Sequence, residues 1–180
     1  TVVKGGEKVI EMAQAGESLL LAPNHSDHSD PHVLLHLARR YGVPIHFMAA
    51  REVFQANHGI NGKVLQRAGV FSIDREGSDL RAIKEAMRIV FSGRHPLVMF
   101  PEGEIFHLNE RLTPLNDGAA TIMLRTAKRL SKEKPERRAA IIPTALRYTY
   151  IEDISPLFGP AMDRLEEFLH WEPQRELPIV

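Results

Sequence analysis

The sequence predicts one α/β domain with a mixed sheet flanked by helices. Short apolar runs of strand length alternate along the chain with segments whose apolar residues recur every three or four positions, the spacing of one helix face. The chain has 180 residues, of which 43% are hydrophobic and 26% charged. This size and composition are typical of a globular domain with one core, so we expect a single domain over residues 1–180.

The expected strands are short apolar runs bounded by turn residues. They cover residues 18–23, 43–49, 70–73, 97–100 and 139–146. The last run contains Pro143, which indicates an edge strand or a strand end, because proline has no amide hydrogen to donate to a neighbouring strand. The order and direction of the strands do not follow from the alternation alone.

The expected helices combine helical apolar spacing with residues typical of helix ends. They cover residues 30–41, 61–68, 78–92, 117–130 and 161–171. We expect Asp30 to be the N-cap of the first helix, followed by Pro31 in its first turn, with Gly42 at its end. Ser78 is the expected cap of the third helix. Strands and helices of this kind in alternation predict layers of helices on a sheet.

Charge, cysteine content and hydropathy exclude several classes of protein. Lys and Arg number 23 and Asp and Glu 23, so the formal net charge is zero, which argues against an electrostatic binder of nucleic acid. The absence of cysteine excludes disulfides, thiolate nucleophiles and cysteine zinc sites. No apolar run approaches the roughly 20 residues of a membrane-spanning helix. Because the chain opens on Thr1, we expect a piece trimmed at both ends, with any membrane anchor outside it.

Histidine is unevenly distributed, because four of the nine lie within twelve residues: His25, His28, His32 and His36. The segment 24–30 lies at a strand-to-helix junction, where polar side chains commonly meet ligands. His25 and Asp30 are five positions apart, about 17 Å in an extended chain, so they meet only if the loop folds back. A carboxylate in contact would fix the imidazole tautomer and make His25 a general base for a hydroxyl. The alternatives are a helix cap for Asp30 and an exposed loop position for His25.

Three further segments follow or contain predicted strands. Residues 69–75 end in Asp and Arg75, whose guanidinium offers a fork of donors to a phosphate; the alternative is a solvated strand end with an ion pair. In residues 100–104, Glu102 can accept a hydrogen bond from a substrate hydroxyl and the turn amides can face an oxyanion; the alternative is a tight turn with exposed acids. Residues 141–145 alone indicate no function.

In this order and spacing, the four segments resemble the four blocks of the glycerolipid acyltransferase family, most nearly its bacterial 1-acylglycerol-3-phosphate acyltransferases. The matching segments are His25 to Asp30, Gly69 to Arg75, Phe100 to Gly103, and Ile142 with Pro143. The resemblance spans residues 20–146. It implies a glycerolipid acyltransferase-like α/β fold with a mixed, mostly parallel sheet flanked by helices.

The resemblance implies transfer of a fatty acyl group from acyl-CoA or acyl-carrier protein to a lysophospholipid hydroxyl, most nearly that of 1-acylglycerol-3-phosphate, in phospholipid synthesis. It implies His25 as the general base, Asp30 as its orienting partner and Arg75 as a ligand of the acceptor phosphate. Glu102 and Gly103 are implied in acceptor binding, and Gly103 also in the oxyanion site. A thioester is already activated, so no cofactor and no metal are expected.

The third block departs from the family pattern. That block normally continues from Gly into Thr or Ser and then Arg, whereas this chain continues with Glu104, Ile105 and Phe106. A phosphate-binding Arg is therefore missing at that place, and Arg111 is a candidate substitute. Another lysolipid or hydroxyl acceptor is the resulting alternative. Pro143 of the fourth block is expected to be structural, near the acyl-donor side.

Two rival functions use other features. His32 and His36 have the spacing of a helical metal-ligand pair, and Asp27 and His28 lie nearby, which would fit a metallohydrolase; the Glu of the metalloprotease helix is absent. A non-enzymatic lipid-binding module would keep an apolar cleft and a phosphate ligand but would not need His25.

Residues 125–138 carry seven basic residues against two acids. Such a stretch suits the anionic head groups of a membrane or the phosphates of CoA, and its alternative is a solvated helix end. We expect the protein at the cytoplasmic face of a membrane, held peripherally or by segments outside this chain.

Overall fold

The computed structural model describes residues 2–55, 60–74, 79–109 and 111–172. The chain divides into two compact units, residues 1–147 and 148–180. The first unit holds the sheet, and the described part of the second, residues 148–172, holds one helix. One domain over residues 1–180 stays a prediction.

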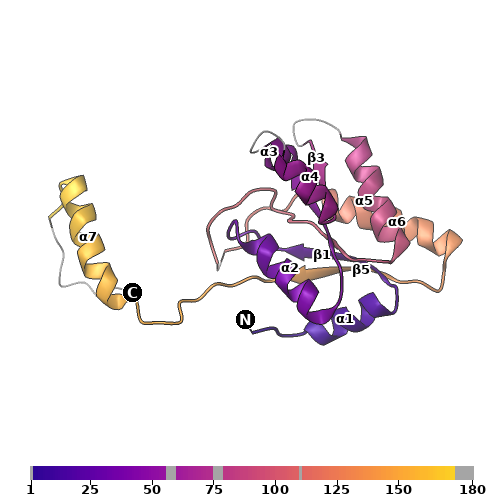
Figure 1. Ribbon diagram of the computed structural model, residues 1–180, viewed down its shortest axis with the longest axis horizontal. Helices are drawn as coiled ribbons and strands as arrows, with labels where there is room; N and C mark the ends of the chain where they lie inside the picture. The colour runs from indigo at the N-terminus through magenta and orange to yellow at the C-terminus, as the bar shows by residue number, and fades with distance from the viewer. Residues whose placement is uncertain (1, 56–59, 75–78, 110, 173–180) are drawn as a thin grey trace. The chain divides into compact units, whose positions relative to one another are not determined.

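The first unit is built on a five-stranded parallel sheet (Figure 1). The strands are β1 (Ser18–Pro23), β2 (His46–Ala50), β3 (Val70–Ile73), β4 (Leu97–Val98) and β5 (Ala139–Thr144). Their order is β3-β2-β4-β1-β5, and the β1–β4, β1–β5, β2–β3 and β2–β4 pairings are all parallel. The α/β class and the mostly parallel sheet are confirmed; the described strands include none of the antiparallel pairing that a mixed sheet would require.

Helices connect and flank these strands. They are α1 (Gly6–Gln14), α2 (Asp30–Tyr41), α3 (Arg51–Gln55), α4 (Ile60–Arg67), α5 (Leu80–Ser92) and α6 (Gly118–Glu133), with α7 (Ser155–Leu169) in the second unit. Gly42 takes the left-handed conformation, φ 65°, that ends α2 as expected. The sequence patterns missed α1 and α3. They also began α7 too late, because Pro160 lies inside the helix and costs it one amide donor rather than ending it.

The N-cap of α5 is a correction to the sequence-based expectation. Ser78 lies outside the described residues, and the residue that caps the helix is Asp79, whose Oδ1 accepts a hydrogen bond from the Ala82 amide at 3.0 Å. A carboxylate at this position satisfies one of the amides that the first helical turn leaves without a partner.

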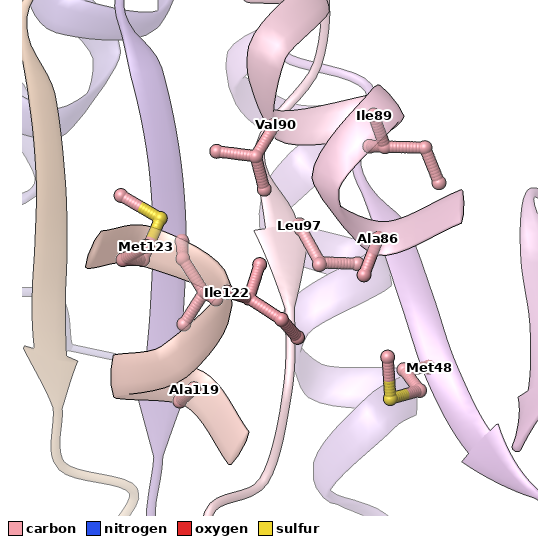
Figure 2. Close-up of a cluster of buried hydrophobic side chains, with 9 residues drawn as sticks. Met48, Ala86, Ile89, Val90, Leu97, Ala119, Ile122 and Met123 are labelled. Atoms are coloured by element: carbon pink, nitrogen blue, oxygen red, sulfur yellow. The ribbon is translucent and has the colours of Figure 1, made fainter. Parts of the chain in front are cut away.

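The core covers both faces of the sheet, because adjacent strand residues point to opposite sides. One buried cluster joins the strands to α5 and α6: Leu20, Met48, Ala86, Ile89, Val90, Leu97, Ala119, Ile122 and Met123. Figure 2 shows side chains of α5 and α6 converging around Leu97. The other cluster contains Leu34, Phe47, Val70, Val98 and Leu146. Burial on both faces explains why the strands read as continuous apolar runs.

Among the described residues, no helix combines the length and apolarity that crossing a bilayer requires. The strands β1, β4 and β5 run in the same direction side by side, so the segments that follow their carboxyl ends meet at one edge of the sheet. Ligands bind at this edge in open α/β sheets.

Candidate active site

His25 and Asp30 meet in the loop between β1 and α2. The His25 Nδ1 atom lies 2.9 Å from Asp30 Oδ2. The same oxygen accepts the amides of Ser26 at 2.8 Å and Asp27 at 3.0 Å. Asp30 is fully buried, and its Oδ2 acts as an acceptor for both amides. Nδ1 is therefore the nitrogen of the His25 ring that carries the hydrogen. The loop therefore folds back, as contact between His25 and Asp30 requires.

Asp30 is not the N-cap of α2, and that expectation is wrong. Ser29 occupies the cap position without a side-chain bond to the helix, while Asp30 is the first helical residue. Its carboxylate turns back to the loop, because three donors from residues 25–27 converge on it. Pro31 follows within the first turn as expected, where its missing amide costs nothing.

Two neighbours hold the His25 loop in place. The Phe100 ring stacks on the His25 ring, with centroids 4.0 Å apart and planes inclined by 18°. The Asn24 side chain donates to the Leu146 carbonyl at 3.0 Å and accepts the Leu146 amide at 2.6 Å, which ties the loop to the segment after β5. The His25 side chain is only 15% exposed. Its ring is therefore restrained on one face and at Nδ1.

Glu102 lies against the same loop from the turn after β4. Its Oε1 accepts the His25 amide at 2.9 Å, and its Oε2 accepts the Thr113 hydroxyl. The Asn116 side-chain amide donates to the Glu102 carbonyl at 3.2 Å. With 7% of its surface exposed, Glu102 is buried rather than an exposed acid of a turn. Its role in acceptor binding stays a prediction.

Gly103 completes the turn after Glu102. Its φ of 77° lies in the left-handed region, which favours glycine, and its amide donates to the Phe100 carbonyl at 3.2 Å. A Cβ at this position would lie 2.8 Å from the Asn116 Nδ2 atom. Glycine is therefore favoured by the backbone conformation, and a larger residue would also displace the end of the Asn116 side chain. The oxyanion role of Gly103 stays a prediction, and its amide already has an acceptor within the turn.

Arg75 and Pro143 are the two remaining site residues predicted from the sequence, and the structure describes only Pro143. Arg75 lies outside the described residues, so phosphate binding by it stays a prediction. Its neighbour Asp74 pairs with Arg51 of α3 at 3.2 Å, and the alternative of a local ion pair at this strand end also stays a prediction. Pro143 lies in β5, an edge strand, opposite Ala22 of β1, which confirms the edge position. Its place on the acyl-donor side stays a prediction.

The sequence also indicated a metal site formed by other histidines of the cluster together with Asp27. His28 makes an edge-on ring contact with His107 at 6.0 Å. The Ser29 amide, which donates to Asp27, holds the pKa of the Asp27 carboxyl below its usual value. Across the residues that the structure describes, no three His, Asp or Glu side chains are grouped so as to hold a metal ion. The metallohydrolase alternative therefore lacks a ligand cluster there.

Part of the basic stretch 125–138 is engaged in structural contacts. Arg137 donates to the carbonyls of Phe91 at 2.9 Å and Ser92 at 2.8 Å, at the end of α5. The Arg129 guanidinium pairs with Glu133 at 2.8 Å. Arg137 immediately precedes the residues that lead into β5, so it lies at the amino-terminal edge of the sheet, away from the His25 loop.

Sequence reasoning missed Asn24, Thr113 and Asn116. Asn24 lies next to His25 in the segment 24–30, but no spacing rule predicts its hydrogen bonds to Leu146. Thr113 and Asn116 lie eleven and fourteen residues after their partner Glu102, in a stretch without regular secondary structure. Only the folded path of the chain brings them to it.

Comparison with known proteins gives two kinds of match. Residues 3–147 match the family model described as Acyltransferase. The chain is 26% identical over 158 residues to a glycerol-3-phosphate acyltransferase of Aeromonas hydrophila, which covers 85% of this chain and 19% of that protein. It is 23% identical over 158 residues to a glycerol-3-phosphate acyltransferase of Baumannia cicadellinicola, which covers 85% of this chain and 18% of that protein. The chain thus spans about a fifth of the length of these curated relatives.

Proposed function

Because the chain belongs to the acyltransferase family, we propose that it transfers a fatty acyl group from a thioester to a hydroxyl of a glycerol phosphate. The family expected from the four sequence blocks, and with it the class of enzyme, is confirmed. The donor is acyl-CoA or acyl-carrier protein. The acceptor is glycerol 3-phosphate, which the names of the two relatives favour, or its 1-acyl derivative, which the sequence blocks favour.

The observation that carries this proposal is the contact between His25 and Asp30. The buried carboxylate accepts the Nδ1 hydrogen, which directs the lone pair of the ring to Nε2. Nε2 is then the base for the acceptor hydroxyl. As the proton arrives, the ring becomes an imidazolium, and Asp30 stabilises this charge from 2.9 Å.

The reaction balances with groups that this arrangement supplies. The acceptor hydroxyl loses its proton to His25 Nε2 while its oxygen forms a bond to the thioester carbonyl carbon. The carbon–sulfur bond of the resulting tetrahedral adduct then breaks, and the sulfur leaves with the electron pair. His25 returns the proton to the sulfur, so the products are an ester and a free thiol. Placement of both substrates at this base supplies much of the rate.

Apolar side chains beside the site support a lipid substrate. The strap, residues 104–109 and 111–116, leads from the Glu102 turn toward α6 and exposes four large apolar side chains: Phe106, Leu108, Leu112 and Leu115. The Phe106 amide donates to the His25 carbonyl at 3.3 Å, so the strap passes next to the base. An acyl chain lying along the strap would bring its carbonyl carbon toward His25. The same surface suits peripheral contact with a membrane.

A transfer assay over pairs of donors and acceptors tests the proposal. The donors are a long-chain acyl-CoA and the matching acyl-carrier protein; the acceptors are glycerol 3-phosphate, 1-acylglycerol-3-phosphate, lysophosphatidylcholine and glycerol. We expect an acylated product with a glycerol phosphate acceptor and much slower transfer to glycerol. Binding of these lipids without transfer from either donor would overturn the proposal and favour the lipid-binding module.

A further inference from the structure

We propose that Thr113 and Asn116 are positioning residues, which hold Glu102 against the main chain of His25 and so fix where the base lies. This inference deepens the proposed function and rests on it. It also gives Glu102 a different task from acceptor binding, because both of its carboxylate oxygens face hydrogen-bond donors of the protein itself.

The contacts come from one short segment that returns to the turn after β4. The Asn116 amide donates to the Pro101 carbonyl at 2.8 Å. The Asn116 side chain donates to the Glu102 carbonyl, and the Thr113 hydroxyl to the Glu102 carboxylate. Three bonds therefore fix both the main chain and the side chain of Glu102. We call residues 113–116 the clamp.

The clamp acts on His25 through Glu102. The His25 amide donates to Glu102 Oε1 at 2.9 Å, and the His25 carbonyl accepts the Phe106 amide at 3.3 Å. Both main-chain groups of His25 are thus bonded to residues 102–106, while Asp30 bonds to the His25 ring and to the amides of the two residues that follow. A displacement of about 1 Å at a catalytic group can cost about a hundredfold in rate, so movement of the Glu102 carboxylate is expected to reach the chemistry.

Burial makes these bonds hard to replace. Glu102 is 7% exposed, so water has little access to a carboxylate oxygen that has lost its donor. A Cβ at Gly103 would lie 2.8 Å from Asn116 Nδ2, so a side chain there would push the Asn116 amide away from its place beside Glu102. Loss of the Thr113 hydroxyl is therefore expected to leave a buried oxygen of Glu102 short of a donor.

Thr113→Val tests the proposal, since valine keeps the shape of threonine and removes the hydroxyl. We expect kcat to fall about 10- to 100-fold with the KM of the acceptor changed by less than about threefold, because the base is misplaced while the acceptor site is intact. Thr113→Ser restores the hydroxyl and should recover most of kcat. The matched control is Thr126→Val, which removes a buried hydroxyl that bonds to the Ile122 carbonyl within α6; it should leave kcat unchanged.

A second readout does not depend on activity. The imidazole resonances of His25, assigned by nuclear magnetic resonance with the His25→Gln variant, should shift in Thr113→Val and Asn116→Ala but not in Thr126→Val. If the wild type transfers no acyl group while these shifts occur, the proposed function fails and the clamp stands. A rise in the acceptor KM with unchanged kcat in Thr113→Val would overturn the clamp, as would unshifted His25 resonances in both variants.

Discussion

Both edges of the sheet hold carboxylates that accept main-chain amides, but the side chains paired with these carboxylates differ. At the carboxyl-terminal edge, Asp30 is fully buried and Glu102 is 7% exposed, and both bond to main-chain amides. At the amino-terminal edge, the Glu17 side chain is 10% exposed and accepts the Arg138 amide at 2.7 Å, but the Arg138 side chain that pairs with it is 82% exposed. The His25 side chain that pairs with Asp30 is only 15% exposed, so both members of that pair are held in place, whereas an ion pair with an exposed partner contributes little to stability. The burial of both partners, and not of the carboxylate alone, distinguishes the site.

The largest effect is expected from Asp30→Asn at the carboxyl-terminal edge. The asparagine side chain has nearly the same shape but no charge to stabilise the imidazolium. Its NH2 group also cannot accept the hydrogen bonds that the His25 ring and the loop amides donate to Oδ2. We expect kcat to fall at least about 100-fold. Steady-state kinetics measures this fall, and a thermal melt shows whether the variant is folded. A folded variant with wild-type kcat would mean that Asp30 has no part in the reaction.

Gly103→Ala is expected to have the next largest effect, and Gly42→Ala separates its two causes. Both glycines have positive φ, 77° and 65°, so alanine costs about 1–2 kcal/mol at either place. Only at Gly103 would the new Cβ meet a neighbour, the Asn116 side chain at 2.8 Å; nothing lies within 4 Å at Gly42. Thermal denaturation should show both losses. Activity of the folded protein should fall only for Gly103→Ala, and equal activities would contradict the clamp.

Arg137→Ala probes the amino-terminal edge and is expected to reduce stability alone. The guanidinium donates to the Phe91 and Ser92 carbonyls at the end of α5, where a cation also complements the helix dipole. We expect a loss of about 1–2 kcal/mol in the free energy of unfolding. The kcat of the folded variant should match the wild type. A large fall in kcat without a change in stability would show that this edge takes part in catalysis.

Asp79→Ala is expected to give the smallest effect and one that depends on pH. The Ala82 amide, which donates to the Asp79 carboxylate, lowers the pKa of this group in the folded protein. Ionised Asp79 therefore stabilises the fold above its unfolded pKa of about 3.9, and this contribution is lost as the pH falls through the lower folded pKa. The wild type should melt at a higher temperature than the variant at pH 7, and the gap should narrow below about pH 4. A gap that is constant with pH would exclude the carboxylate as its cause.

Much of the fold follows from local pattern. The strands β1 and β3 have the predicted limits, because each is an apolar run bounded by residues that end a strand. The helix α1 was missed although Val9, Ile10 and Ala13 have helical spacing, because Gly5 and Gly6 stand at its start and have no capping side chain. Strand order came from the fold alone, because it depends on which crossovers pack and not on any one segment.

The site was predictable only in part, for a physical reason. His25 and Asp30 are close in sequence and recognisable as a pair, but the Asp-Pro pattern indicated a helix cap, and the loop amides that attract Asp30 appear only when the loop folds back. Glu102 was recognised as a functional residue, yet its partner Thr113 is eleven positions away through irregular chain. Contacts of that kind arise from tertiary structure and leave no periodic signal.

The central claim is that His25 is the base for acyl transfer, and the kcat of His25→Ala beside His36→Ala tests it most directly. His36 is an exposed histidine of α2, so its loss controls for removal of an imidazole as such. With the best donor and acceptor of the panel, we predict that His25→Ala lowers kcat at least about 100-fold while His36→Ala leaves it within about twofold of the wild type. Equal turnover by a folded His25→Ala protein would contradict the account.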